Sequence, residues 1–210
     1  MRVIAIDGPA GSGKSTVAKA LAARLNLDYL DTGAMYRAVA FAAIQKQIRP
    51  SEIEEITEIA KSLDLELTEE SCVVNGVDAT IEIRGPEVTS LVSQVATMPE
   101  VRIEMVKRQR AWAETRNGGV MEGRDIGSVV FPDAMLKIYL TASEEVRAAR
   151  RAAEVKEGDV AIVAADIERR DAVDTQRAAS PLVEAEDAIV VDTSAMTLQQ
   201  VVDHVIGLIP

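Results

Sequence analysis

The chain has 210 residues and a formal net charge of −11, a length that suits one domain with inserts and is ample for a sizeable core. Apolar residues make up 48% of it and charged residues 27%, which leaves little room for disorder. The acidic balance argues against nucleic-acid polymers as partners, because binding a phosphate backbone needs a surplus of lysine and arginine.

The cysteine content and the N-terminus indicate the compartment. The single cysteine, Cys72, cannot form a disulfide within the chain, which fits a reducing cytoplasm. The apolar run before Asp7 is too short for a signal peptide or a membrane span. We therefore expect a cytoplasmic protein with no membrane partner.

The first predicted element is a strand over residues 3–6, because a short apolar run of this kind suits a parallel strand buried on both faces. A helix with one aliphatic face follows over residues 14–25. The next segment, residues 27–47, predicts another strand, turn and helix, with Thr32 placed to cap the helix.

Further along the chain, Ser51 and Glu54 have the spacing of a capping box at the start of a helix. Short alternating runs around Asn75-Gly76 predict a hairpin and a small antiparallel sheet between residues 65 and 84. The remaining predicted elements are helices over 87–96 and 101–114, strands over 119–123 and 135–140, arginine-rich helices divided near Gly158, a strand over 188–193 and a helix over 198–209.

Strands that alternate with helices predict a three-layer α/β fold with a central parallel five-stranded sheet. The hairpin region, about residues 63–85, interrupts this alternation and is interpreted as an insert. We expect a single domain over residues 1–210.

Between the first strand and the first helix, the sequence matches G-x-x-x-x-G-K-[ST], the pattern of a P-loop. Its glycines let backbone N–H groups converge on an anion, and the helix N-terminus adds positive potential. Lys14 can reach the β- and γ-phosphates, and the Ser15 hydroxyl can coordinate Mg²⁺. A glycine turn that only joins strand to helix would not account for both side chains. The predicted nucleoside-triphosphate site consists of Gly8, Pro9, Ala10, Gly11, Ser12, Gly13, Lys14, Ser15 and Thr16.

Arginines in or next to predicted loops indicate what the P-loop serves. They are Arg37, Arg102, Arg124, Arg147, Arg150, Arg151, Arg169, Arg170 and Arg177. Exposed ion pairs would explain any one of them alone. In the two helices that flank Gly158, however, they cluster at i, i+3 and i+4 spacings. A lid that closes over transferring phosphates needs such guanidinium groups to neutralise charge while water is excluded. A small kinase is therefore favoured over other P-loop proteins.

The chain resembles the bacterial cytidylate kinases nearly end to end, from Arg2 to about Val205. The segments that carry the resemblance appear in the family's order: IDGPAGSGKST, LDTGAMYRAVA, SQVATMPEVRIEMVKRQR, EGRDIGSVVFPDA, RAARR and ERRDAVDTQRAASPL. The resemblance implies transfer of the γ-phosphoryl group of ATP, with Mg²⁺, to CMP or dCMP by a monomer. It also implies a P-loop core, a lid over residues 147–170 and a region over residues 32–100 that binds the monophosphate and contains the insert.

The resemblance further implies roles for individual residues. Those toward CMP are Thr32, Arg102 and Asp125 for the cytosine ring, Arg37, Arg124 and Arg177 for the monophosphate, and Ser93, Arg170 and Asp174 for the pentose. On the ATP side, Arg150 would stack on adenine, and Arg147 and Arg151 would meet the transferred phosphate. The residues implied in catalysis are Lys14, Arg124, Arg147, Arg151 and Arg177.

Two positions depart from the family pattern. Thr32 stands where some members have serine, and Glu122 stands where others have aspartate; Glu122 could still hold a water on Mg²⁺. Two other functions stay open: a nucleotide-gated binding module that does not need CMP, and a kinase for the hydroxyl of a small metabolite. We expect His204 and Cys72 to be structural.

Overall fold

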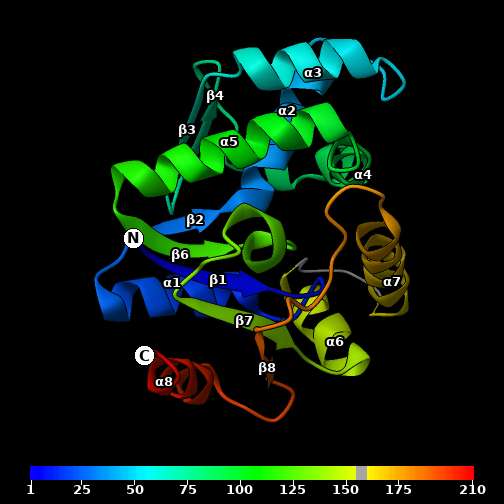
Figure 1. Cartoon of the computed structure of the whole chain (residues 1–210). Helices are drawn as coiled ribbons and strands as arrows, with labels where there is room; N and C mark the ends of the chain where they lie inside the picture. The colour runs from blue at the N-terminus through cyan, green and yellow to red at the C-terminus, as the bar shows by residue number, and fades with distance from the viewer. Residues whose placement is uncertain (155–159) are drawn as a thin grey trace. The chain divides into compact units, whose positions relative to one another are not determined.

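The computed structural model describes residues 1–154 and 160–210 (Figure 1). The chain divides into two compact units: unit 1 comprises residues 1–29 and 113–210, and unit 2 comprises residues 30–112. Part of the predicted lid, residues 155–159 with the predicted break near Gly158, lies outside the described residues.

The central sheet is parallel and has the strand order β2-β6-β1-β7-β8. Its strands are β1 (Arg2–Asp7), β2 (Tyr29–Asp31), β6 (Gly118–Glu122), β7 (Leu136–Thr141) and β8 (Ile189–Asp192). Ile6 pairs with Glu122 on one side and with Ile138 on the other, so the carboxyl ends of β1, β6 and β7 lie at one edge. Ligands of parallel α/β sheets bind at this edge.

The helices of unit 1 follow these strands in the chain, and α8 comes after the last of them, β8. They are α1 (Lys14–Leu25), the short π-helix η2 (Ile126–Val130), α6 (Glu144–Glu154), α7 (Val160–Gln176) and α8 (Leu198–Gly207). The last of them starts at a capping box, in which the Thr197 hydroxyl accepts from the Gln200 N–H and the Gln200 amide oxygen accepts from the Thr197 N–H. This reciprocal pair satisfies two N–H groups that a helix start leaves open.

Unit 2 contains helices and a small sheet. Its elements are α2 (Thr32–Gln45), α3 (Ile53–Ser62), β3 (Leu65–Leu67), β4 (Cys72–Val74), β5 (Val77–Asp78), the 3₁₀ turn η1 (Glu82–Arg84), α4 (Pro86–Val95) and most of α5 (Pro99–Thr115). The three strands are antiparallel in the order β3-β4-β5. Asn75 and Gly76 both have positive φ, as the tight turn of a hairpin requires.

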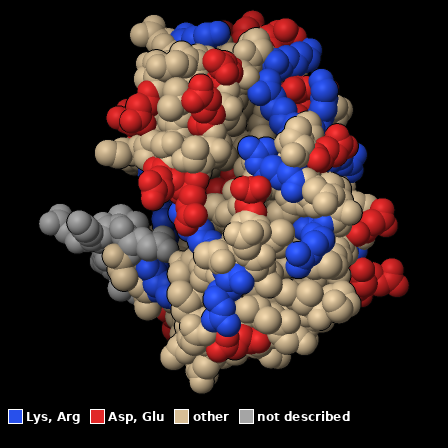
Figure 2. Space-filling model, turned by 90° about the vertical axis from the view of Figure 1, so that its left-hand side faces the viewer, with Lys and Arg blue, Asp and Glu red and all other residues tan. Residues whose placement is uncertain are grey.

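Acidic and basic side chains are interspersed on the face of the protein shown in Figure 2. Within the described ranges, no helix combines the length and the apolar character that crossing a lipid bilayer requires. The acidic excess of the composition is thus accompanied, on this face, by lysine and arginine side chains rather than by a uniform negative surface.

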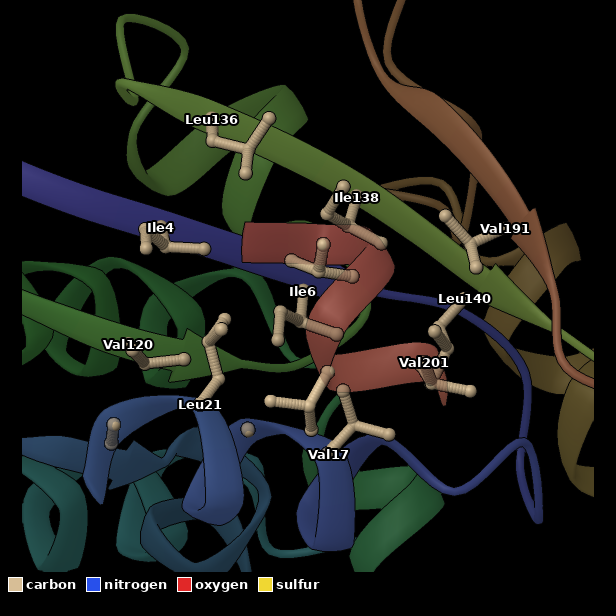
Figure 3. Close-up of a cluster of buried hydrophobic side chains, with 14 residues drawn as sticks. Ile4, Ile6, Val17, Leu21, Val120, Leu136, Ile138, Leu140, Val191 and Val201 are labelled. Atoms are coloured by element: carbon tan, nitrogen blue, oxygen red, sulfur yellow. The ribbon is translucent and has the colours of Figure 1, made fainter. Parts of the chain in front are cut away.

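A core of aliphatic side chains lies between the sheet and helices α1 and α8 (Figure 3). Ile4 and Ile6 of β1 are fully buried there, against Leu21 of α1 and Val201 of α8. Burying a side chain of this size stabilises the fold by about 1.5–3 kcal/mol. Because β1 and α1 both enter this core, the loop that joins them is held at both ends.

One predicted helix start is wrong. The capping box of Ser51 and Glu54 does not form, because α3 begins at Ile53 and its N-cap position is Glu52. The Glu52 carboxylate instead accepts from the backbone N–H of Arg49 at 2.7 Å and pairs with its guanidinium at 3.1 Å. An ionised carboxylate is a stronger hydrogen-bond acceptor than a serine hydroxyl.

The predicted α/β fold with a central parallel five-stranded sheet is confirmed, and so is the small antiparallel sheet within the insert. Unit 2 contains the range 32–100 for which monophosphate binding is predicted. That assignment, like the lid over residues 147–170, stays a prediction.

Candidate active site

The P-loop follows β1 and lies close against β7 and α6. Gly8 and Gly11 both have positive φ, 147° and 73°. A Cβ at Gly8 would lie 2.1 Å from the carbonyl oxygen of Leu140, and one at Gly11 would lie 2.8 Å from that of Arg147. Both distances are shorter than any tolerable contact, so these positions admit only glycine. The glycines therefore let the loop backbone approach its neighbours.

The start of α1 suits an anion. Gly13 occupies the N-cap position with a left-handed backbone and offers no side chain to cap the helix. The first turn contains no acidic residue, and Ser15 and Thr16 are exposed. The N–H groups at a helix start, together with the helix dipole, attract phosphate oxygens.

Lys14 is buried, and its ammonium folds back onto the loop. It donates to the carbonyl oxygen of Pro9 at 2.6 Å and to the Ser12 hydroxyl at 3.3 Å. Burial and the charge of Arg124 lower the pKa of Lys14 to about 7, although Glu122 opposes this. The negative charge of a polyphosphate would raise that pKa again and favour the ammonium form.

Two carboxylates end the strands beside the loop. Asp7, at the end of β1, accepts from the backbone N–H groups of Ile126 and Gly127 at 2.8 and 2.7 Å. Burial raises the pKa of Asp7 to about 6, against the effect of these hydrogen bonds. Glu122, at the end of β6, is buried and accepts from the Tyr29 hydroxyl. Sequence analysis assigned no role to Asp7, whose one signal was a charge at the end of an apolar strand.

Arg147 of α6 and Asp171 of α7 form an ion pair that holds the P-loop at Ala10. The guanidinium donates to the Ala10 carbonyl oxygen at 2.9 Å, and Asp171 accepts from the Ala10 N–H at 2.8 Å. This ion pair thus binds both the N–H group and the carbonyl oxygen of Ala10. Sequence analysis did not single out Asp171, because nothing local distinguishes it from other acidic residues of its helix.

Arg150, one helical turn further, holds the same loop at Ser12. Its guanidinium donates to the Ser12 carbonyl oxygen at 3.2 Å and to the hydroxyl and carbonyl oxygens of Thr193, both at 2.9 Å. Thr193 lies just after β8, so this arginine joins two loops at the carboxyl edge of the sheet. The neighbouring Arg151 is half-buried.

The residues predicted to bind CMP that belong to unit 1 form a connected cluster of charges. Arg124 donates to Asp174 at 2.9 Å, and Arg177 lies 3.5 Å from Asp174 and 3.7 Å from Asp125. Arg177 also donates to the carbonyl oxygen of Ser180 at 2.6 Å. Burial acts to lower the pKa of Arg124, but nearby carboxylates, Asp174 foremost, raise it above its ordinary value.

Arg170 lies in the same region of α7. Its Nε is buried and has no hydrogen-bond partner within residues 1–154 and 160–210. Burial and the charge of Arg124 both lower the pKa of Arg170. Burying a donor without a partner is costly, so this Nε suits a ligand that would accept its hydrogen bond.

Two predicted arginines belong to unit 2. Arg37 donates to the carbonyl oxygen of Ile83 and to the Thr89 hydroxyl, both at 3.0 Å. Arg102 is buried, donates to the carbonyl oxygen of Ala96 at 3.1 Å and lies with its guanidinium 5.4 Å from the centre of the Tyr36 ring. Each guanidinium is therefore oriented by its own unit.

Thr32 and Ser93 also belong to unit 2. Thr32 is buried and is the first residue of α2, so its prediction as the helix cap is wrong. Asp31 occupies the N-cap position, and its carboxylate accepts from the Ala34 N–H at 2.9 Å. The carboxylate is the better cap because it is charged and the helix start is positive. Ser93 is half-buried in α4.

Ser15, at the start of α1, is the residue predicted to contact Mg²⁺. Over the described part of the chain, no group of three or more histidine, cysteine, aspartate or glutamate side chains could hold a metal ion. Mg²⁺ is commonly bound through one or two protein oxygens and the phosphates of a nucleotide. The exposed Ser15 hydroxyl can be such an oxygen.

The two residues expected to be structural are His204 and Cys72. His204 is exposed on α8. Cys72 is buried, and burial raises the pKa of its thiol to about 11. A thiol with this pKa is protonated at neutral pH and is a poor nucleophile.

Comparison with known proteins shows the family to which the chain belongs. The family model for cytidylate kinase matches residues 4–210. Relatives named cytidylate kinase include one from Corynebacterium efficiens, 49% identical over 98% of this chain and 93% of its own, and one from Desulforamulus reducens, 50% identical over 98% and 95%. An uncharacterised protein from Eubacterium ventriosum, 13% identical with a TM-score of 0.56 over 100% of this chain and 98% of its own, shares the fold. The chain belongs to the cytidylate kinase family.

Proposed function

We propose that the chain transfers the γ-phosphoryl group of ATP to CMP or dCMP, giving ADP and CDP or dCDP. Membership of the cytidylate kinase family makes it a nucleoside monophosphate kinase. The observation that carries the proposal is the presence, within unit 1, of a P-loop and of an arginine cluster in which Arg177 is buried and the buried Nε of Arg170 has no hydrogen-bond partner among the described residues. Such a cluster suits a second anionic ligand.

The P-loop is proposed to bind ATP. The N–H groups at the start of α1 would bind phosphate oxygens, and the Lys14 ammonium would exchange the Pro9 carbonyl for the β- and γ-phosphates. Arg147 and Arg150 hold the loop backbone at Ala10 and Ser12, which supports a role on the ATP side. The stacking of Arg150 on adenine, and the contact of Arg147 and Arg151 with the transferred phosphate, stay predictions.

The cluster around Arg177 is proposed to bind CMP. Arg124 and Arg177 would hold the monophosphate, and Arg170 and Asp174 the pentose. Asp125 would accept from the exocyclic amine of cytosine, whereas the uracil carbonyl at that position would face the carboxylate unfavourably. The roles of Thr32, Arg37, Ser93 and Arg102 toward CMP stay predictions.

No side chain is proposed as a general base. The acceptor is a phosphate anion, and phosphoryl transfer through a loose transition state gains mainly from alignment and charge stabilisation. Mg²⁺ bound with ATP through the Ser15 hydroxyl would neutralise developing phosphate charge. We further propose that the chain works as a monomer in the cytoplasm.

A coupled assay of ADP release tests the proposal. ATP and Mg²⁺ are supplied with CMP, dCMP, UMP, AMP or shikimate, and we expect rapid ADP release with CMP and dCMP. Release of ADP without any acceptor, and without stimulation by CMP, would indicate a nucleotide-gated module instead. Release with shikimate alone would indicate a kinase that acts on a hydroxyl group.

A further inference from the structure

The Asp7 side chain binds backbone groups that are far from it in the sequence. It directly precedes Gly8 of the P-loop, yet both of its carboxylate oxygens bind a distant segment. Oδ1 accepts from the Ile126 N–H at 2.8 Å and Oδ2 from the Gly127 N–H at 2.7 Å. The side chain is 6% exposed. A buried carboxylate whose two oxygens each bind one of two consecutive N–H groups fixes both the place and the direction of that backbone.

These N–H groups belong to the start of η2, where a helix leaves its donors without internal partners. The residue at the N-cap position, Asp125, would ordinarily satisfy them with its own carboxylate. Among the described residues, Asp125 makes no capping hydrogen bond to η2, and its carboxylate lies 3.7 Å from Arg177 instead. Asp7 therefore supplies the cap at the start of η2.

The turn is also confined on its other side. A Cβ at Gly127 would lie 3.1 Å from the Lys137 side chain of β7, so the backbone there has little room to move. Lys137 is itself held by Asp187, at 2.7 Å. The start of η2 is thus held between β1 and β7, the two adjacent strands of the sheet.

We infer that Asp7 is a positioning residue for the acceptor nucleotide: by capping η2 it orients the backbone that carries Arg124 and Asp125. This inference rests on the proposed function, in which Arg124 binds the monophosphate of CMP and Asp125 reads its base. Both side chains precede η2 directly, so a turn that loses its cap would change their directions together.

Asp7 acts on the acceptor site rather than on the P-loop that follows it in the sequence. Its charge also acts on Lys14, but the charges of Glu122 and Asp171 have the larger effect on that lysine. Loss of the Asp7 charge therefore leaves Lys14 with its main acidic neighbours. Loss of the Asp7 carboxylate should therefore weaken the binding of CMP more than that of ATP, although Asp7 is next to the P-loop in the sequence.

The test compares Asp7→Asn with Asp203→Asn. Both replace a carboxylate by an amide of the same size, but Asp203 is exposed on α8, pairs with Arg24 and takes no part in holding η2. In Asp7→Asn the amide nitrogen faces an N–H group, so one hydrogen bond is lost. We expect KM for CMP to rise about tenfold, the scale of one buried group left unsatisfied, with a smaller preference for CMP over UMP. KM for ATP should change little, and Asp203→Asn should match the wild type.

A merely structural role predicts a different result: a lower melting temperature with KM for CMP and the base preference unchanged. That outcome, or a rise in KM for ATP as large as that for CMP, would overturn the inference. Asp7→Ser, which keeps one acceptor, serves as a second variant should Asp7→Asn not fold, and should show the same pattern. Adding Asp7→Asn to Asp125→Ala should reduce the base preference no further, because Asp7 acts through Asp125. Wild-type protein without CMP-dependent ADP release would refute the proposed function instead.

Discussion

Lys14 is a single side chain on which the proposed transfer depends, and its surroundings explain why. Its ammonium is buried beside both arginine and carboxylate charges, so its charge state responds to any anion that enters the loop. An alanine here would remove the one mobile positive charge that the P-loop itself offers. The loop glycines and the start of α1 would stay in place.

We expect Lys14→Ala to lower kcat by about 10²–10³-fold, the effect of losing one group that stabilises transition-state charge. Binding of CMP, measured by calorimetry, should stay close to that of the wild type. Lys107→Ala, at an exposed lysine of α5, is the control. An unchanged kcat would remove the P-loop from the mechanism.

Asp125 carries the proposed discrimination between bases. Asp125→Ala should reduce the advantage of CMP over UMP by about 1–3 kcal/mol, because the carboxylate no longer favours an amine over a carbonyl. The ratio of kcat/KM for CMP to kcat/KM for UMP measures this preference. A ratio equal to that of the wild type would show that another group reads the base.

Asp7 also makes stability depend on pH. Its pKa is about 6 in the folded protein against 3.8 ordinarily, so the folded state holds the proton more tightly. Its contribution is therefore most favourable below pH 3.8 and is lost as the pH rises through about 6, a change of about 3 kcal/mol at most. The free energy of unfolding of the wild type minus that of Asp7→Asn should fall between pH 4 and pH 7. A constant difference would contradict this shift.

At the scale of elements, α6 and the P-loop act on each other through backbone contacts. Arg147, with Asp171, takes both backbone groups of Ala10, and Arg150 takes the carbonyl of Ser12. A helix that holds the loop in this way can set its shape before ATP arrives. Preorganised groups lose less freedom on binding.

Arg150→Ala should weaken the binding of ATP more than that of CMP, because the substitution releases the P-loop at Ser12 and the segment after β8 at Thr193. Dissociation constants for each nucleotide alone provide the measurement. Arg169→Ala is the matched control, since this arginine is exposed on α7 and, among the described residues, its ion pair is with Asp166 of the same helix. A larger loss for CMP would mean that the two nucleotide sites are exchanged.

Element positions followed closely from sequence patterns, but the N-cap residues of α2 and α3 did not. The periodicity of residues 14–25 predicts α1 at its observed ends, since its aliphatic face must enter the core. At α2 and α3, in contrast, hydroxyl caps were predicted and carboxylates stand at the N-cap positions. Several polar residues precede each helix. Which of them takes the N-cap position depends on the direction in which the preceding segment enters the helix.

At the scale of the whole molecule, binding of CMP should increase the free energy of unfolding. A ligand at about 100 times its dissociation constant adds about 2.7 kcal/mol to the free energy of unfolding. We expect CMP to raise the melting temperature and shikimate to leave it unchanged, as measured by thermal unfolding at matched concentrations. Protection by shikimate and not by CMP would favour the kinase that acts on a hydroxyl.

The sequence alone determined the α/β class, the P-loop and the small antiparallel sheet, because each depends on residues close together in the chain. Only the tertiary structure decided which distant backbone groups the carboxylates of Asp7 and Asp171 bind. Asp7 meets residues 126 and 127, and Asp171 meets Ala10, 161 positions away. No local pattern encodes such a contact, because it exists only after the sheet has aligned the carboxyl ends of its strands and brought separate loops to one edge.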